Sequence, residues 1–176
     1  MIKIISNKKG FSLIELMVVV VILGLIVLGL VTFFTGGARS WISGQSQLEA
    51  QRNARQAMDI MVREIREASN IKENSTSYKI IFRTPWVIND LEYSWTGNTW
   101  EPIYKKGTVP PLINNVQSLT FKYFDSSDGE ITTLPITVAD ALKISKVCID
   151  LQVDVDKDSN PDITLNSDVD LRNFGL

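Results

Sequence analysis

Glu15 is the residue best placed to do chemistry, because it is a carboxylate at the start of a long apolar run. From Lys8 the chain reads KKGFSLIELMVVVVILGLIVLGLVTFFTGGAR, and 23 residues without Asp, Glu, Lys or Arg separate Glu15 from Arg39. A carboxylate near hydrocarbon costs on the order of 3 kcal/mol. We therefore expect Glu15 to have a partner that stabilises its charge.

Two partners for Glu15 follow from its neighbours. Ser12-Leu13-Ile14-Glu15 has the form of a capping box, in which Glu15 accepts a hydrogen bond from the Ser12 amide. Cleavage between Gly10 and Phe11 would create the second, because a new α-amino group is largely cationic at neutral pH. That ammonium could pair with Glu15 of the same helix or of a neighbouring subunit. Since an unpaired charge in low dielectric is costly, pairing would select one register between stacked helices.

The remaining composition argues against an enzyme. The chain has no His, and Cys148 is its single Cys, so His-based catalysis and an intrachain disulfide are both excluded. We find no Gly-rich phosphate loop, Ser nucleophile elbow or Cys-x-x-Cys motif. The net charge is −2, and no basic face suggests nucleic acid. We expect no catalytic residues and no nucleic-acid partner, with Cys148 acting as a small hydrophobic residue.

One acidic segment offers oxygen ligands at alternating positions, as Ca²⁺ prefers. It runs from Asp154 to Asp162 with the sequence DVDKDSNPD. An EF-hand loop needs Gly at its sixth position and Glu at its twelfth. Both are absent here, whether the loop is counted from Asp154 or from Asp156. We expect no metal and no cofactor, and interpret the segment as an acidic hairpin turn whose carboxylates face solvent. Calcium at this loop remains the alternative.

The element that positions Glu15 is a membrane helix. The apolar run from Phe11 to Phe34 exceeds the roughly 20 residues that cross a bilayer. Lys3, Lys8 and Lys9 precede it, which predicts a single-pass anchor in the cytoplasmic membrane with its N-terminus inside. A secretory signal peptide is the alternative, but its apolar region would be only about 7–15 residues long.

A second helical pattern follows a Gly-containing junction, GGARSWISGQS, that we expect to kink the helix. Residues 47–70 show apolar side chains at spacings of three and four, which predict an amphipathic helix packed on a sheet. The stripe consists of Ala54, Met58, Met61, Ile65 and Ala68. Charged residues fill much of the opposite surface, which we interpret as solvated or, in part, as a contact with neighbouring subunits.

From Ser77 onward the sequence predicts strands. YKIIFR, LEYSWTGNTWEPIYKK, VQSLTFKYFDSSDGEITTL, ISKVCIDLQVDV and DITLNSDVDL alternate apolar and polar residues, with turns expected at Gly97-Asn98 and Asp128-Gly129. Trp86, Trp95 and Trp100 are expected to be packing residues. One long helix followed by short antiparallel strands predicts an α+β domain, with the helix covering one face of the sheet.

The N-terminal residues resemble a known signal. KKG-FSLIEL followed by an uncharged apolar run is similar to the class III signal of type IV prepilins and pseudopilins. The resemblance implies that a membrane-embedded prepilin peptidase cuts after Gly10 and N-methylates Phe11. It also implies that Glu15 is needed for incorporation into a filament. One departure is the absence of the Pro that many major pilins carry inside the apolar helix.

The C-terminal part narrows the resemblance. NARQAMDIMVREIREA, LTFKYFDSSDGE and the closing VDLRN resemble the J-type minor pseudopilins of type II secretion and the W-type minor pilins of type IV pili. That likeness implies a pilin-like fold and a role in filament initiation at the tip. The implied partners are other pilins or pseudopilins, contacted through the N-terminal helix, the prepilin peptidase and an inner-membrane assembly platform. The single Cys148 argues against a major pilin with a C-terminal disulfide loop.

The expected division of the chain is a leader at 1–10, a transmembrane helix at 11–35, an amphipathic helix at 36–76 and an extracytoplasmic β-rich domain at 77–176. The resemblance places the mature filament in the periplasm or at the cell surface. A membrane-anchored binding protein that never polymerises is the alternative. The sequence leaves open whether the filament serves secretion, a pilus or DNA uptake.

Overall fold

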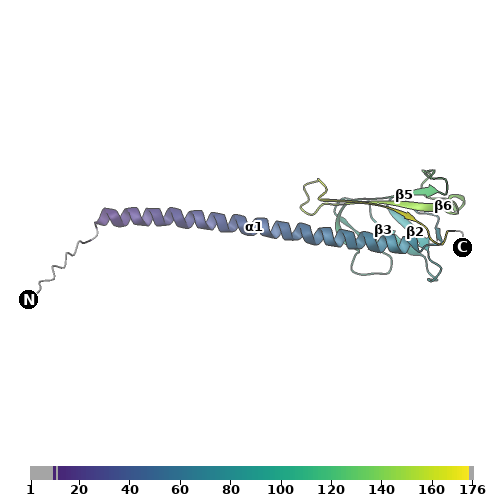
Figure 1. Ribbon diagram of the computed structural model, residues 1–176, viewed down its shortest axis with the longest axis horizontal. Coiled ribbons are helices and arrows are strands. Elements are labelled where there is room, and N and C mark those ends of the chain that lie inside the picture. The colour runs from purple at the N-terminus through teal and green to yellow at the C-terminus, as the bar shows by residue number, and fades with distance from the viewer. Residues whose placement is uncertain (1–9, 11, 175–176) are drawn as a thin grey trace, which may run out of the picture. The chain divides into compact units, whose positions relative to one another are not determined.

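The computed structural model describes residue 10 and residues 12–174 (Figure 1). The expected leader, apart from Gly10, and the expected new N-terminus Phe11 therefore lie outside the described residues. The chain divides into two compact units, Met1–Gln45 and Ser46–Leu176. This boundary lies within a single helix, so the two units share one element of secondary structure.

That helix, α1, runs without interruption from Leu13 to Arg66. It contains a window with a mean hydropathy of 3.1, long and apolar enough to cross a membrane. Within that part, Thr32 and Thr35 donate their hydroxyls to the carbonyls of Leu28 and Val31, so these two hydroxyls need no water. The helix assignment continues through the junction that contains three glycines, where a kink was expected. Each glycine costs about 1 kcal/mol relative to Ala but does not forbid the helix.

In the second unit, the apolar side of α1 is buried as predicted. Ala54, Met58, Met61 and Ile65 lie in the hydrophobic core, together with Ala57, which the predicted stripe omitted. Figure 1 shows this part of α1 running alongside the strands. The helix therefore has an amphipathic second half, whereas the side chains of residues 12–49 are all exposed.

The helix ends at Arg66 and not at residue 76, which corrects the expected range of 36–76. The reason is competition for backbone donors. The amide of Ser69 bonds to the carbonyl of Arg83, and the amide of Lys72 bonds to that of Ile81, so this stretch pairs with a strand instead of continuing the helix. The sheet accordingly begins at residue 70, before the expected boundary at 77.

The sheet has seven strands in sequence order, and each pairs antiparallel with the next. The strands are β1 (Asn70–Ile71), β2 (Lys79–Arg83), β3 (Leu91–Ser94), β4 (Glu101–Lys105), β5 (Ile113–Asp125), β6 (Ile144–Val153) and β7 (Ile163–Asp170). The predicted α+β class is confirmed, with one long helix and an antiparallel sheet.

Alternation along the strands supplies the other half of the core. On β6, Val147, Ile149, Leu151 and Val153 are buried, as the period of two predicts. Cys148, on the opposite face of β6, is buried as well. The core of the second unit is thus built from one side of α1 and the inward positions of the sheet.

Both predicted turns form, but a second strand follows only the first of them. Gly97 adopts a φ of +86° between β3 and β4, as the predicted hairpin requires. The turn at Asp128-Gly129 also forms, since the Asp125 amide bonds to the Gly129 carbonyl. Within the described residues 126–137, a single bridge from Phe124 to Glu130 follows it, and no second strand forms there.

A short helix, α2 (Val138–Ala141), precedes β6. The hydroxyl of Thr137 caps it by accepting a hydrogen bond from the Asp140 amide at 3.2 Å. A Thr followed three residues later by Asp is the sequence signal that could have predicted this element.

The three tryptophans that were expected to pack differ from one another. Trp95 is buried, Trp100 is 39% exposed and Trp86 is 82% exposed. The prediction was therefore wrong for Trp86, which lies on the loop between β2 and β3, where no strand pairing holds its side chain against the core.

Candidate functional site

Glu15 lies in the first turn of α1 and bonds to its own chain. The Ser12 amide donates to Oε2 of Glu15 at 3.0 Å, and the Leu16 amide donates to the Ser12 carbonyl at 3.2 Å. The helix begins at Leu13, so Ser12 occupies the capping position. This is the Glu15 half of the predicted capping box, and a carboxylate here also interacts favourably with the positive end of the helix dipole.

The surroundings of this carboxylate are apolar. Ile14, Val18 and Val19 line a shallow hollow together with Glu15. The Ser12 amide occupies Oε2, and no donor among the described residues contacts Oε1. The geometry therefore leaves one carboxylate oxygen able to accept a hydrogen bond from an incoming cation. The predicted cation, the ammonium of Phe11, lies outside the described residues.

The sequence around Gly10, Phe11 and Glu15 matches a known N-terminal sequence motif. Residues 5–31 match the model of the prokaryotic N-terminal methylation motif. The match includes Gly10, Phe11 and Glu15, and confirms the resemblance to type IV prepilins. No curated protein matches the chain.

The motif supports a type IV pilin-like or pseudopilin protein that is processed by prepilin peptidase and assembles with other pilins. With the apolar first part of α1, it also supports membrane anchoring. The pilin-like family is structural and not enzymatic. Cleavage between Gly10 and Phe11, methylation of Phe11 and the assembly role of Glu15 stay predictions at the level of single residues.

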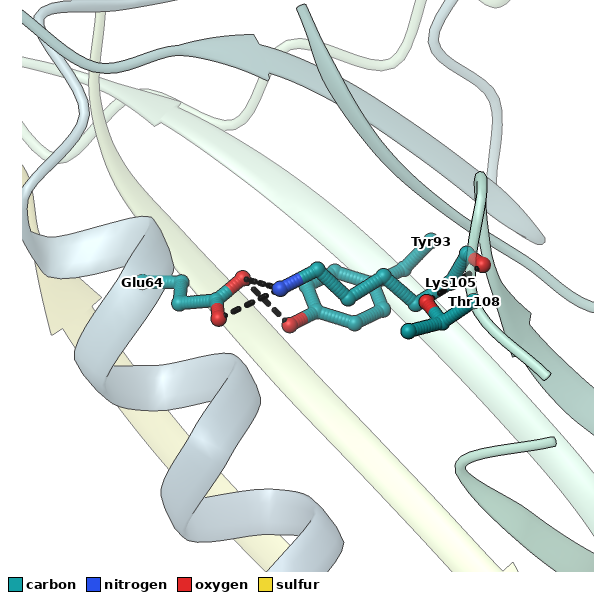
Figure 2. Close-up of polar contacts among 4 residues, drawn as sticks. All are labelled: Glu64, Tyr93, Lys105 and Thr108. Atoms are coloured by element: carbon teal, nitrogen blue, oxygen red, sulfur yellow. Dashed lines mark hydrogen bonds and ion pairs between the residues drawn. The ribbon is translucent and has the colours of Figure 1, made fainter. Parts of the chain in front are cut away.

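A second arrangement, which the sequence did not predict, joins α1 to the sheet (Figure 2). Glu64 accepts hydrogen bonds from Lys105 at 2.6 and 2.8 Å, and from the hydroxyl of Tyr93 at 2.7 Å. Tyr93 belongs to β3 and Lys105 to β4, so one helical carboxylate contacts two neighbouring strands. We call these three residues the Glu64 cluster.

The Glu64 cluster stabilises the packing of α1 on the sheet. Tyr93 is fully buried, and the Glu64 and Lys105 side chains are only 20% and 25% exposed. Burial and the hydrogen bond to Glu64 raise the pKa of Tyr93 above its ordinary value, so the phenol stays protonated and donates. The Lys105 ammonium also lies 5.9 Å from the centre of the Tyr93 ring. These contacts give the cluster a structural role.

The loop between β6 and β7 contains the acidic segment. Its first acid, Asp154, is fully buried, which corrects the interpretation that all these carboxylates face solvent. Its oxygens accept hydrogen bonds from the Lys157 amide at 2.7 Å, the Ser159 amide at 3.0 Å and the Trp100 indole at 3.1 Å. A buried carboxylate needs such donors, and here they hold the loop against Trp100.

The pKa shifts in this loop follow from these contacts. Burial raises the pKa of Asp154, but the hydrogen bonds from Trp100, Ser159 and Lys157 outweigh burial, so its net pKa is lowered. The pKa of Asp156 is raised, first by burial and then by the charges of Asp158 and Asp162, although a hydrogen bond from the Asp158 amide opposes the shift. The exposed part of the loop therefore carries carboxylates that repel one another.

The alternative of calcium at this loop stays a prediction. Carboxylate oxygens of Asp154, Asp156 and Asp162 lie within 4.8 Å of one another, close enough to share an ion. However, three protein donors already bond to Asp154, and Asp162 accepts hydrogen bonds from the Val155 amide and the Gln47 amide group. The loop is thus held together by its own donors, and a chelator-dependent melting temperature would test the metal.

Proposed function

We propose that the chain is a minor pilin or pseudopilin, a filament subunit that acts at filament initiation. The observation that carries the proposal is the methylation motif at residues 5–31, which coincides with a carboxylate at the start of an exposed apolar helix. In this proposal prepilin peptidase cuts between Gly10 and Phe11 and methylates Phe11. The chain is inserted with its N-terminus in the cytoplasm, and its second unit is extracytoplasmic.

Glu15 would guide assembly through the chemistry at the start of α1. Its Oε2 bonds to the Ser12 amide, so Oε1 remains for the ammonium of Phe11, on the same helix or on a neighbour. In lipid an unpaired ammonium is costly, and only one axial position of a neighbouring helix brings it to a carboxylate. The side chains of Ile14, Val18 and Val19 make the surroundings of this contact apolar.

The first experiment is mass spectrometry of the mature protein. An N-methylated Phe11 as the first residue supports the proposal, and the product should be absent from cells without prepilin peptidase. An intact Met1, or a cut near Ala38, would instead support the membrane-anchored binding protein that never polymerises, or a secretory signal peptide.

The second experiment measures assembly. The variant Glu15→Gln should be processed normally but be depleted at least tenfold from sheared filaments, because the amide carries no charge to pair with an ammonium. Glu49→Gln, a neutralisation elsewhere on α1, is the matched control and should assemble normally. Undiminished incorporation of Glu15→Gln would contradict the assembly role.

The initiation role needs a separate test, since it depends on resemblance. Deleting the gene for this chain should lower the number of filaments per cell without shortening those that remain. In unmodified cells, antibody labelling should find the chain at filament ends. Uniform labelling along the shaft would contradict the tip position. The same deletion strain would be tested for secretion, for pilus formation and for DNA uptake. The activity that is lost identifies the system that the filament serves.

A further inference from the structure

A row of arginines lies on the exposed face of the second half of α1. We call Arg52, Arg55, Arg63 and Arg66 the arginine stripe. Their spacings of three, eight and three place them on one side of the helix, with Asp59 between them. All five residues are exposed, whereas the core side of the same helix is buried. Side chains from Arg52 to Arg63 surround a shallow hollow on this face.

The arginine stripe takes part in no ion pair among the described residues. Among the described residues, ion pairs are made by Arg83 and by five lysines, and by no member of the stripe. Four arginines and Asp59 leave a net charge of +3 on one face. Arg52–Arg55 and Arg63–Arg66 are like charges three residues apart, whereas Asp59 lies four residues from both Arg55 and Arg63, so these pairs roughly offset one another in the isolated subunit.

The β6–β7 loop presents the opposite charge. Asp156, Asp158 and Asp162 are exposed, and no ion pair involves them in the described part of the chain. The nearby Lys157 does not pair with these acids, because its ammonium lies 6.0 Å from the centre of the Trp100 ring. Repulsion within the loop, which contributes to the raised pKa of Asp156, would be relieved by an incoming cation.

Among the described residues, these two surfaces form no ion pair with each other. The loop already contacts α1 at Gln47, through Asp162 at 3.1 Å, and none of its acids pairs with the stripe. We propose that the arginine stripe of one subunit binds the exposed β6–β7 carboxylates of a second copy of this chain. Planar guanidinium groups match carboxylates in paired hydrogen bonds, which gives such a contact its geometry.

The contact would be head to tail. The two complementary patches lie on different elements, so the contact is heterologous, and two bound copies keep one free stripe and one free loop. The inference rests on the proposed function, because it assigns the contact that places successive copies at the start of a filament. Nucleic acid fits the stripe less well, since Asp59 interrupts it and the chain is net negative.

The test uses the full chain in its membrane, with Cys148→Ala as the background. One tagged copy carries Gln56→Cys, within the stripe, and a second, differently tagged copy carries Asn160→Cys, within the loop. A short bis-maleimide is added in the presence of EDTA, so that no cation occupies the carboxylates. We expect a covalent dimer that contains both tags, at a yield that falls severalfold in high salt.

Charge reversal then identifies the contact. Arg52→Glu with Arg55→Glu on the first copy should lower the yield at least fivefold, as should Asp156→Arg with Asp158→Arg on the second. Combining the two reversed copies should restore the product. Lys72→Glu with Lys79→Glu makes the same change of charge outside the stripe and should leave the yield unchanged.

Three results would overturn the contact: a yield insensitive to reversal, no rescue by the combined reversal, or Gln56→Cys that cross-links only to another protein. Filament incorporation and the mature N-terminus are measured on the same variants. A processed chain that enters filaments without the cross-link contradicts this contact alone, whereas a chain that is never processed contradicts the proposed function.

Discussion

Neutralising Glu64 should weaken the attachment of α1 to the sheet, even though the change is as small as Glu64→Gln. The Lys105 ammonium lies 2.6 and 2.8 Å from the two carboxylate oxygens, and the variant leaves that ammonium without a counter-charge. Tyr93 can still donate to the amide oxygen, so the loss reports on the charge and not on the phenol. The contact in question is drawn in Figure 2.

The size of the effect follows from the burial of the pair. Breaking a fully buried ion pair costs about 3–5 kcal/mol, and an exposed pair contributes about 0.2–1 kcal/mol. With side chains 20% and 25% exposed, the Glu64 cluster lies between these limits. We expect Glu64→Gln to lower the free energy of unfolding by about 2 kcal/mol, roughly a thirtyfold change in the unfolding equilibrium. A double-mutant cycle with Lys105→Met should give a coupling energy of about 1 kcal/mol.

The assay is urea unfolding of the full chain in detergent micelles, followed by its tryptophan fluorescence, to which Trp95, buried in the second unit, contributes. Glu67→Gln, an exposed neutralisation on the chain just after α1, serves as the control and should change stability by less than about 0.5 kcal/mol. If Glu64→Gln and Glu67→Gln behave alike, or the coupling energy is zero within error, the attribution of stability to this cluster is wrong.

Two further predictions concern Asp154, in the β6–β7 loop, and Asp125, the last residue of β5. Asp154→Asn should cost about 2–3 kcal/mol in the same unfolding assay, because its new NH₂ group faces a donor in the buried site formed by Trp100, Lys157 and Ser159; an unchanged stability would contradict the structural role of this carboxylate. Hydrogen bonds from the amides of Gly129 and Ser127 lower the pKa of Asp125 below 3.8, so its contribution is present above that pH and is lost as the pH falls through the lowered value. Unfolding measured from pH 5 to pH 2 should therefore show a smaller acid-induced loss of stability in Asp125→Asn than in the unchanged chain, and equal slopes would refute this.

Local signals predicted most of the fold. The spacing of Ala54, Met58, Met61 and Ile65 predicted the buried side of α1, and alternation along β6 predicted its inward positions. Both patterns depend on residues a few positions apart, which a period of 3.6 or 2 captures. The chemistry at Glu15 was local as well, since its partner Ser12 lies three residues away.

The features that the sequence did not predict depend on contacts between residues far apart in the chain or on very short elements. The members of the Glu64 cluster are 29 and 41 residues apart and meet only because the sheet order brings β3 and β4 beside α1. The early end of α1 depends on carbonyls of β2, which accept the amides that would have continued the helix. Burial of Asp154 could not be inferred from alternation, because it results from a loop closing over a tryptophan from a different hairpin.

The hydrogen bond between Ser12 and Glu15 has a consequence for subunits that have not yet assembled. If the start of α1 lies in a bilayer, as proposed, this donor lowers the cost of the Glu15 carboxylate in an unassembled subunit. In the proposed function, joining a polymer would give Oε1 of Glu15 a donor, whereas Oε2 already has one on its own chain.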